Sequence, residues 1–368
     1  MKILHINTNY TGTTLHKNMV DSLTAYCTNY VFVPTHDPGK SKVPIGEHVH
    51  VSRCFRKWDR LFYFYKQGKI RREAESVYDI ESFDLLHAYT LFTDGNVAYN
   101  LHKKYGIPYV VAVRNTDVNA FFKYRPHLRG RGVKILRNAA AVFFLSSSYQ
   151  NQVMGKFVPK KYHQEILDKT HIIPNGIDPS WFEGGESHRA PADRRVRMIF
   201  AGNIDRNKNI VKAAEGCALL RKKGYDATLT VVGRVVEEQV KNQLSELSHV
   251  KIHPPMTMEE LSRAYETHDI FIMTSIYESF GLVYAEAMSR GLPVIYSRGQ
   301  GFDGQFPDGE VGYGVRSSVA EDIPVAVEKI LADYEPMSRR CVEKSGRFRW
   351  DAFAAAYYDI YHQEVSKM

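Results

Sequence analysis

Short apolar runs of strand length recur along the chain and are separated by longer segments in which apolar residues repeat at helical spacing. Continuous apolar runs are typical of strands buried on both faces, and strands that alternate with helices favour parallel sheets. The expected strands cover residues 1–7, 30–34, 84–88, 109–113, 141–145 and 171–174, then 197–201, 227–233, 250–255, 270–273 and 293–296. This pattern predicts a protein of the α/β class.

The length of the chain indicates more than one folding unit. At 368 residues it exceeds a single ordinary hydrophobic core. A polar stretch at residues 181–197 contains two glycines and a proline, and we interpret it as a linker. We therefore expect one domain over residues 1–180, a second over residues 181–345, and a helical C-terminal segment over residues 346–368.

One segment of the second half, residues 269–297, has the pattern of a strand–helix–strand unit. Its first apolar strand is followed by a loop at 274–280 and a helix at 281–290. Gly291 occupies the usual position after a helix, and Pro293 prevents the helix from continuing. Because parallel sheets place ligands at the carboxyl ends of their strands, we expect a binding site at this loop.

Two carboxylates flank the start of that helix. Glu278 lies in the loop, and Glu286 lies about five residues into the helix, roughly 7.5 Å along its axis. The backbone N–H groups near Phe280, Gly281 and Leu282 lack helical partners and form an anion site between the two carboxylates. A sugar at Glu278, a diphosphate at the helix start and a ribose at Glu286 would fit. Solvated charges on a helix face are the alternative interpretation of both glutamates.

The sequence around these glutamates, ESFGLVYAEAMSRGLPVI, resembles the retaining glycosyltransferases of family 4, whose signature is Glu, seven residues, Glu. The resemblance implies the GT-B fold, in which two Rossmann-like doubly wound α/β domains face a central cleft. It implies that the first domain binds the acceptor, the second binds a nucleotide-sugar donor, and residues 346–368 cross back to the first. It also implies that Glu278 contacts the donor sugar, that Glu286 contacts the ribose hydroxyls, and that Ser279 lies beside the donor.

Three loop positions extend the resemblance to the phosphate groups of the donor. Relatives read Gly-Arg-x-x-x-x-Lys where this chain reads GNIDRNK, so Lys208 matches the lysine that binds the diphosphate. Asn203 stands where the arginine is expected, and Arg206 is a candidate substitute for it. Gly12 is the glycine that remains in the loop at residues 8–14, which is glycine-rich and faces the diphosphate in relatives. An ordinary strand-to-helix turn is the alternative for that loop.

The first half departs from the histidine that the family usually has near the bond that breaks. Relatives commonly read His-Gly-x-Asp after the strand that ends here at residue 113. Arg114 replaces the histidine in this chain, and Asp117 fits the aspartate. A guanidinium can neutralise phosphate charge, and a buried pair of Arg114 with Asp117 is the alternative. The candidate catalytic residues are therefore Glu278, Lys208, Arg114 and Asp117.

Composition and motifs exclude several other classes of protein. A hydrophobic share of 44% and a charged share of 24% are typical of soluble globular proteins. No apolar run approaches the roughly 18 residues of a membrane span. The four cysteines lie far apart without metal-ligand spacing, which indicates reduced thiols in a cytoplasmic protein. The sequence has no Asp-x-Asp pair, so we expect neither a metal nor another cofactor, and without a Gly-x-Gly-x-x-Gly after a strand a dinucleotide dehydrogenase is disfavoured.

The positive charge of the chain is concentrated in its first half. Residues 1–180 contain 25 Lys and Arg against 14 Asp and Glu, a net charge of +11, and the remaining residues contain 24 against 27, a net charge of −3. This asymmetry indicates an anionic partner of the first half. Because nothing else resembles a nucleic-acid-binding module, we favour an anionic membrane surface or a phosphorylated acceptor over nucleic acid.

Residues 52–72 combine much of this charge with aromatic side chains, since they contain eight basic residues, one acid and six aromatics. We expect a helix here whose aromatic stripe has basic side chains around it. The stripe comprises Phe55, Trp58, Phe62 and Tyr65, and the basic residues around it are Arg56, Lys57, Arg60 and Lys66. A surface that contacts a membrane or the acceptor is one interpretation, and a helix packed on the sheet with solvated charges is the other.

Taken together, the residues and the resemblance predict a metal-independent, retaining glycosyltransferase that uses a nucleotide-sugar, with a UDP-sugar favoured over a GDP-sugar. The acceptor would be a glycan or a lipid-linked glycan in the synthesis of a bacterial cell-surface polysaccharide such as capsule, O-antigen or exopolysaccharide. The protein would then bind peripherally to the cytoplasmic face of the cell membrane. The alternatives are a GT-B relative that epimerises or hydrolyses nucleotide-sugars, and a non-catalytic relative that binds glycans or membranes.

Overall fold

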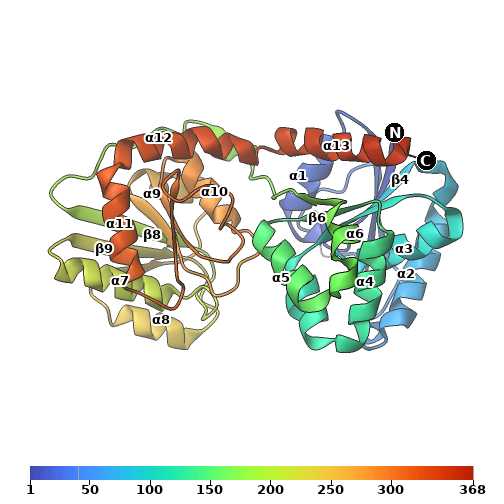
Figure 1. Ribbon diagram of the computed structural model, residues 1–368, viewed down its shortest axis with the longest axis horizontal. Coiled ribbons are helices and arrows are strands. Elements are labelled where there is room, and N and C mark those ends of the chain that lie inside the picture. Colours follow the sequence, from blue (N-terminus) through green and yellow to red (C-terminus); the bar gives the residue numbers. More distant parts are fainter. Residues whose placement is uncertain (40, 368) are drawn as a thin grey trace. The chain divides into compact units, whose positions relative to one another are not determined.

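The computed structural model describes residues 1–39 and 41–367 and contains two compact units (Figure 1). Unit 1 comprises Met1–Gly176 together with the C-terminal helix that begins at Trp350. Unit 2 comprises Ile177–Arg349. The chain therefore passes between the units twice, once after Gly176 and once after Arg349. Each unit has its own parallel sheet.

Unit 1 is built on a seven-stranded parallel sheet with the strand order β3-β2-β1-β4-β5-β6-β7. Its strands are β1 (Lys2–Ile6), β2 (Thr28–Thr35), β3 (Val49–Arg53), β4 (Leu85–Ala88), β5 (Tyr109–Val113), β6 (Ala141–Phe144) and β7 (Thr170–Ile172). Its helices are α1 (Thr14–Leu23), α2 (Tyr63–Val77), α3 (Asp94–Tyr105), α4 (Arg129–Asn138), α5 (Ser147–Phe157), α6 (His163–Leu167) and α13 (Trp350–Ser366). Every residue of β4, β5 and β6 is buried, as expected for strands covered on both faces.

Unit 2 repeats this architecture with a six-stranded parallel sheet in the order β10-β9-β8-β11-β12-β13. Its strands are β8 (Arg195–Ala201), β9 (Asp226–Val232), β10 (Val250–His253), β11 (Ile270–Met273), β12 (Val294–Ser297) and β13 (Gly312–Val315). Its helices are α7 (Ile210–Lys222), α8 (Glu238–Ser245), α9 (Met258–Glu266), α10 (Leu282–Ser289), α11 (Asp322–Ala332) and α12 (Tyr334–Ser345). Both sheets have the order of a doubly wound Rossmann fold, as the sequence predicts.

The strand order determines where a ligand can bind in unit 2. The order reverses at β8, so β9 lies on one side of it and β11 on the other. Strands β8 and β11 are hydrogen-bonded neighbours, with Ile270 of β11 beside Met198 of β8. The crevice of an open α/β sheet opens at such a switch point, outside the carboxyl ends of the strands. The loops that follow β8 and β11 therefore emerge side by side at this edge.

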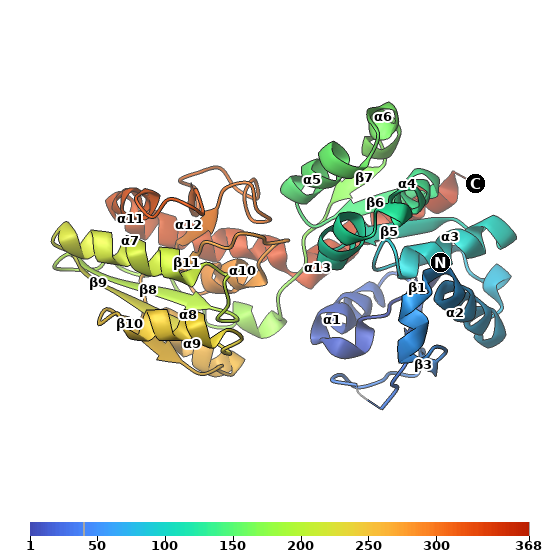
Figure 2. The same cartoon turned by 90° about the horizontal axis from the view of Figure 1, so that it is seen from below.

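The C-terminal helix α13 packs into unit 1 beside α1, as both views show (Figure 1 and Figure 2). The hydroxyl of Tyr361 lies 2.6 Å from Nδ1 of the buried His87. The indole of Trp350 occupies the space where a side chain at Gly176 would stand, since a Cβ there would lie 2.5 Å from the ring. The helix therefore belongs to the core of unit 1. None of the helices in the described part of the chain is long and apolar enough to cross a bilayer.

The segment predicted as a linker, residues 181–197, belongs to unit 2, and that prediction is wrong. Trp181 is buried with its ring centroid 5.7 Å from that of Tyr265. A Cβ on Gly185 would lie 2.1 Å from the carbonyl oxygen of Ser289, so this polar stretch runs directly against the end of α10. Its composition resembles a linker because close backbone packing also requires glycine.

Residues 52–72 do not form one helix, which corrects the predicted aromatic stripe. After β3 the chain forms a 3₁₀ turn, η2 (Lys57–Leu61), and only then enters α2. The carboxylate of Asp59 accepts hydrogen bonds from the backbone N–H of Arg56, at 2.7 Å, and from Nζ of Lys69, at 2.8 Å, and so holds this turn closed. Phe55 consequently lies in the core, whereas Trp58 in η2 is exposed.

Candidate active site

The loops that follow β8 and β11 are held together by an ion pair between two residues that the sequence assigns to the donor site. Nζ of Lys208 lies 2.6 Å from Oε2 of Glu278. The two side chains are 21% and 12% exposed, so the pair is shielded from water but reachable. The other carboxylate oxygen of Glu278 accepts the backbone N–H of Ser279 at 3.0 Å. This places a lysine and a carboxylate at the switch point of the sheet.

The helix that follows Glu278 begins at the same edge. Gly281 has a φ of +82°, a left-handed conformation that favours glycine, and α10 starts at the next residue. The backbone N–H of Tyr284 closes the first turn on the carbonyl oxygen of Gly281, at 3.0 Å. Phe280 is buried beside Phe302 and Phe348. The positive end of the helix dipole therefore lies next to the Lys208–Glu278 pair and favours an anion there.

Glu286 projects from α10 as a carboxyl group without a protein partner. It is only partly exposed, and within residues 1–39 and 41–367 no side chain or backbone group bonds to its carboxyl oxygens. Burial, with a smaller contribution from the negative charge of Asp178, raises the pKa of Glu286 to about 7. A carboxyl group that is largely shielded from water and has no partner in the protein can accept hydrogen bonds from hydroxyl groups of a ligand.

Asn207, which the sequence analysis did not select, fastens the two loops together. Its side chain acts like a short strand, because Oδ1 accepts the backbone N–H of Tyr277 at 3.1 Å and Nδ2 donates to the carbonyl oxygen of Tyr277 at 3.0 Å. Its own carbonyl oxygen accepts the N–H of Ile276 at 2.8 Å. The loop that carries Glu278 is therefore attached through Asn207 to the loop that carries Lys208.

Asn209 supports the same loops from the other side of Lys208. Its φ of +56° is a left-handed conformation that asparagine tolerates better than most residues. Nδ2 donates to the carbonyl oxygens of Thr274, at 3.0 Å, and Ser317, at 2.6 Å. We refer to Asn207 and Asn209 as the asparagine clamp. Two asparagines directly flanking the matched lysine are the sequence signal that could have revealed it.

The glycine-rich loop after β12 forms the third side of this arrangement. Oε1 of Gln300 accepts the backbone N–H of Glu278 at 3.0 Å, and the N–H of Gly301 donates to the carbonyl oxygen of Glu278 at 2.8 Å. A Cβ on Gly301 would lie 2.1 Å from the carbonyl oxygen of Ser279, so only glycine allows this approach. Both backbone groups of Glu278 are thus fixed before any ligand binds.

Arg206 and Asn203 do not join the Lys208–Glu278 pair. The guanidinium of Arg206 is 69% exposed and lies 3.0 Å from a carboxylate oxygen of Glu237. It also bonds to the side chain of Gln239 on α8. Asn203 is exposed at the start of the same loop. The loop thus directs Arg206 toward α8, and in this conformation Arg206 is not positioned to replace the arginine that the family pattern expects at position 203.

Asp117 has a structural position in unit 1. Its two carboxylate oxygens accept the backbone N–H groups of Leu91, at 2.9 Å, Phe92, at 3.0 Å, and Arg114, at 2.9 Å. The residue is buried, and this burial raises the pKa of Asp117 to about 6. Asp117 therefore connects the loop after β4 to the end of β5. It fixes the backbone at this edge of the sheet and does not offer its carboxylate to a ligand.

Arg114 extends from the end of β5 without a side-chain pair to Asp117. Nη1 donates to Oδ1 of Asn175 at 3.0 Å, and Nε donates to the carbonyl oxygen of Tyr89 at 3.4 Å. The predicted alternative of a buried ion pair is therefore wrong, because Asp117 contacts the backbone of Arg114. Gly12 ends the short 3₁₀ turn η1 (Tyr10–Gly12) after β1, at the same carboxyl edge of the sheet.

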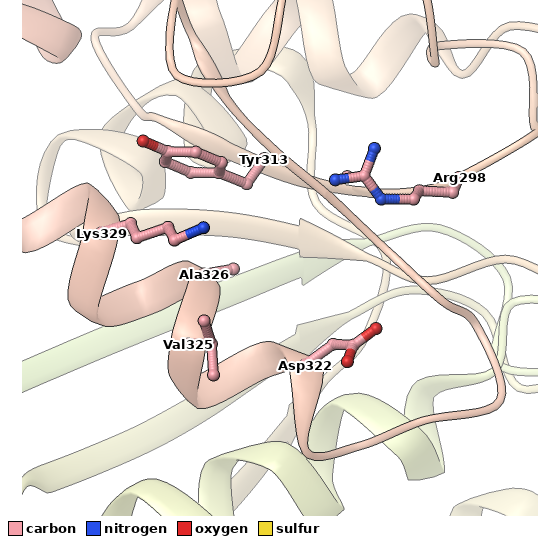
Figure 3. A pocket seen from close by; sticks show the side chains of 7 residues that line it. Arg298, Tyr313, Asp322, Val325, Ala326 and Lys329 are labelled. Carbon is pink, nitrogen blue, oxygen red and sulfur yellow. The ribbon is translucent and has the colours of Figure 1, made fainter.

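A pocket of about 200 Å³ at the outer strand β13 contains none of these residues (Figure 3). Figure 3 shows Lys329 and Asp322 on α11, with Arg298 and Tyr313 across from them. Two of its charged residues are paired within the protein, because Arg298 pairs with Asp308 and Asp322 pairs with Arg316 at 2.6 Å, whereas Nζ of Lys329 lies 5.4 Å from the ring centroid of Tyr313. Most of the charge in this pocket is therefore compensated within the protein.

Two family models match the chain, and each covers most of one unit. The model described as "Glycosyltransferase Family 4" matches residues 18–181, and the model described as "Glycosyl transferases group 1" matches residues 186–347. The second match contains Lys208, Glu278 and Glu286.

Individual proteins with related sequences are also glycosyl-transferring enzymes by name. D-inositol 3-phosphate glycosyltransferase of Paenarthrobacter aurescens is 25% identical over 77% of this chain and 74% of its own length. A probable sucrose-phosphate synthase of Thermosipho melanesiensis is 27% identical over 87% of this chain and 81% of its own length. The solved structure of sucrose-phosphate synthase from Thermosynechococcus elongatus superposes with a TM-score of 0.78 at 19% identity, over 100% of both chains.

The asparagine clamp predicts a local effect of replacing Asn207. Asn207→Ala removes two hydrogen bonds to Tyr277, each of which contributes about 0.5–1.5 kcal/mol. The backbone amides of residues 274–279 should then exchange with deuterium roughly tenfold faster, while those of β9 stay unchanged. Hydrogen exchange read by mass spectrometry checks this, with Arg206→Ala as the control in the same loop. Equal exchange in both variants would contradict the clamp.

Proposed function

Since the chain is a family 4-type glycosyltransferase with the GT-B fold, we propose that it transfers a sugar from a nucleoside-diphosphate sugar to an acceptor with retention of anomeric configuration. The observation that carries this proposal is the pair of Lys208 and Glu278 beside the start of α10, with the unpartnered carboxyl of Glu286 on the same helix. Together these groups offer a cation, a helix N-terminus and two carboxylates at one sheet edge. That set matches a phosphate flanked by two polyols.

The donor would span these groups in the order sugar, diphosphate, nucleoside. Glu278 would accept hydrogen bonds from hydroxyls of the sugar, and Lys208 with the start of α10 would hold the diphosphate. Glu286 would accept from the ribose hydroxyls. Without a donor the charge of Lys208 is neutralised by Glu278, so binding exchanges part of this contact for one with phosphate. The asparagine clamp keeps the backbone of both loops in place during that exchange.

A UDP-sugar is the favoured donor. Supporting this, structural neighbours include Anabaena Alr3699/HepE in complexes with UDP and with UDP-glucose, at 16% and 17% identity and TM-scores of 0.68 and 0.66. The base would contact backbone groups of the loop before α9, which begins at Met258 with Thr257 as its N-cap. A different base occurs in another structural neighbour, the catalytic domain of starch synthase IV from Arabidopsis thaliana, which is bound to ADP and acarbose.

The reaction would proceed on one face of the sugar. The bond between the anomeric carbon and the diphosphate oxygen breaks, the acceptor oxygen bonds to that carbon on the same face, and the acceptor's proton passes to an oxygen of the leaving diphosphate. A double displacement would need a free carboxylate on the opposite face. Glu278 is instead bonded to Lys208 and to the N–H of Ser279. Lys208 and the start of α10 would stabilise the leaving diphosphate without a metal.

The acceptor we propose is a growing glycan, linked to a lipid carrier, in the synthesis of a bacterial cell-surface polysaccharide. In support, one structural neighbour is the lipopolysaccharide outer core galactosyltransferase WaaB, with a TM-score of 0.74 at 15% identity. The acceptor would bind at the carboxyl edge of the unit 1 sheet, where β5 ends before Arg114 and η1 ends at Gly12. An epimerase or hydrolase would convert a UDP-sugar without any acceptor, and incubation of UDP-glucose alone distinguishes it.

The donor proposal predicts that binding of UDP depends on the ionisation of Glu286. Ribose hydroxyls donate to the charged carboxylate, so binding lowers its pKa and releases a proton. Because the pKa of free Glu286 is about 7, the affinity for UDP should rise about tenfold from pH 6 to pH 8 and then level off. Titration calorimetry checks this.

Two variants separate the roles of the glutamates in that experiment. Glu286→Gln should bind UDP more weakly at pH 8 and should retain only the pH dependence that UDP itself contributes. Glu278→Gln should not weaken the binding of UDP, since Glu278 is assigned to the sugar and its replacement releases Lys208 from the ion pair. Equal losses in both variants would refute this division of roles.

We also propose that unit 1 binds an anionic membrane through an exposed aromatic patch. The patch consists of the large side chains Trp58, Leu61, Phe62, Phe64 and Tyr65, which are 54–78% exposed. Arg56, Lys57 and Arg60 are exposed around it. Lys66 is different from the prediction, since its ammonium lies 4.3 Å from the ring centroid of Phe55 and burial lowers its pKa. Exposed apolar groups rimmed by cations fit a lipid interface.

A second basic and aromatic segment adjoins this patch. Tyr63, at the start of α2, packs edge-on against Phe121 with ring centroids 6.1 Å apart. The guanidinium of Arg125 lies 5.0 Å from the ring centroid of Phe121, and Tyr124 between them is 69% exposed. The two segments of the sequence that combine basic and aromatic residues therefore meet on one side of unit 1. Each cation near an anionic bilayer contributes about 1 kcal/mol.

The membrane proposal predicts that apolar side chains of the patch are needed for binding to lipid. Wild type should sediment with vesicles of phosphatidylcholine and phosphatidylglycerol at low salt and less with phosphatidylcholine alone. Trp58→Ala with Phe62→Ala should lower binding about tenfold or more, because the substitutions remove two large apolar side chains that the wild-type protein would bury in the interface. Val236→Ala, an exposed apolar residue of unit 2, is the control. Wild-type protein that ignores anionic vesicles would refute the proposal.

A further inference from the structure

A second charged pocket lies at the carboxyl ends of the outer strands β2 and β3 of unit 1. It encloses about 390 Å³. Its lining is formed by His36, Asp37, Pro38, Arg53, Arg56 and Lys57. Arg53 is the last residue of β3, and His36 follows the last residue of β2. The pocket therefore occupies the edge of a parallel sheet at which ligands bind, on elements other than those that carry Arg114 and Gly12.

Three cations and one carboxylate, that of Asp37, line this pocket. Within residues 1–39 and 41–367, Arg53, Arg56 and Lys57 form no ion pair, and all three are exposed. This contrasts with the pocket of Figure 3, where Arg298 is paired with Asp308. With Asp37 as the one carboxylate of the lining, the three cations leave an excess of positive charge around the pocket and repel each other. An anion that enters the pocket relieves this repulsion.

A fourth cation reaches the pocket through His36. Nη2 of Arg60 lies 3.2 Å from Nδ1 of His36. Since a guanidinium has only donors, Nδ1 of His36 is the acceptor in this contact. The ring of His36 also stacks on the buried Phe55, with centroids 6.0 Å apart. His36 is thus held by two contacts at the wall of the pocket, and the positive charge of Arg60 adds to that of the lining.

We propose that this pocket binds a phosphate or diphosphate group of the acceptor. The inference rests on the proposed function and narrows its acceptor to a phosphorylated one. Arginine guanidinium groups bind phosphate oxygens in pairs, and Lys57 supplies a further point charge. The volume holds a diphosphate and leaves room for part of the group attached to it.

The neighbouring aromatic patch suggests how a lipid-linked acceptor would enter. Lys57 lines the pocket, and Trp58, the next residue, is 78% exposed. A lipid diphosphate would place its phosphates in the pocket and its hydrocarbon chain among the aromatic side chains. A soluble sugar phosphate would use the pocket alone. Both ligands share the phosphate chemistry, so the experiment needs one arm for each source.

Titration calorimetry with inorganic pyrophosphate on the full chain tests the pocket. The Lys208→Ala protein serves as the background, because Lys208 would otherwise contribute a second phosphate site. On this background Arg53→Gln with Arg56→Gln should weaken binding at least about tenfold. Lys160→Gln with Lys161→Gln, which removes the same charge from an exposed turn of unit 1, should change it less than about twofold.

Equal weakening by the two pairs of substitutions, or no binding of pyrophosphate to the Lys208→Ala protein, would overturn the proposal. A measurement that needs no substitution in the pocket runs in parallel. Pyrophosphate should slow deuterium exchange in the wild-type protein over residues 36–38 and 53–57. Unchanged exchange there would also overturn the proposal.

Vesicles identify the source of the phosphate. Phosphatidylcholine vesicles with a polyprenyl diphosphate should bind the protein more tightly than vesicles with the neutral polyprenol, and Arg53→Gln with Arg56→Gln should abolish that difference if the acceptor is lipid-linked. Equal binding to both vesicles, with pyrophosphate binding intact, identifies a soluble phosphate and upholds the site. UDP affinity should be unaffected by the pocket variants. If neither the wild type nor the pocket variants bind UDP, the donor assignment is refuted, while the phosphate-binding pocket is unaffected by that result.

Discussion

The ion pair between Lys208 and Glu278 joins the two loops on which the rest of the proposed donor site depends. It forms because β8 and β11 are neighbours at the point where the strand order reverses, so the loops after them emerge together. Asn207 and Gln300 then fix the backbone on both sides of Glu278. A charged pair held in advance by neutral hydrogen bonds needs little rearrangement when phosphate arrives, which is the condition for effective electrostatic stabilisation of a leaving group.

The carboxyl group of Glu286 lowers the stability of the folded protein at neutral pH. The pKa of Glu286 is raised from 4.5 to about 7, so the folded state holds its proton more tightly than the unfolded state does. Above pH 7 Glu286 therefore lowers the free energy of unfolding by its full amount. This loss becomes smaller as the pH falls from 7 toward 4.5, so stability rises over that range. A group that destabilises the empty protein at neutral pH is typical of a binding site, where a ligand restores the missing contacts.

Much of this architecture could be predicted from the sequence, because buried strands and the βαβ unit around Glu278 have strong local patterns. The GT-B fold is confirmed, β11 has its predicted bounds, and Lys208 and Glu278 meet as neighbours in space. The two asparagines beside Lys208 mark the position of the asparagine clamp in the sequence. Their partners in the loop after β11, like the partners of Arg206, are contacts between distant loops that no local pattern encodes. The same limit explains two wrong predictions. The glycines at 181–197 allow close packing and do not mark a linker, and the predicted aromatic stripe at 55–65 is interrupted because Asp59 closes a turn.

The central claim is that Lys208 and Glu278 act as one unit in binding the donor. A double-mutant cycle on the affinity for UDP-glucose tests it, using Lys208→Ala, Glu278→Gln and the double variant in calorimetry with EDTA present. Residues in direct contact show coupling energies of about 0.5–3 kcal/mol, so the account predicts that the double variant departs from the sum of the single effects by at least about 0.5 kcal/mol. Additive effects, or binding that requires a divalent ion, would contradict it.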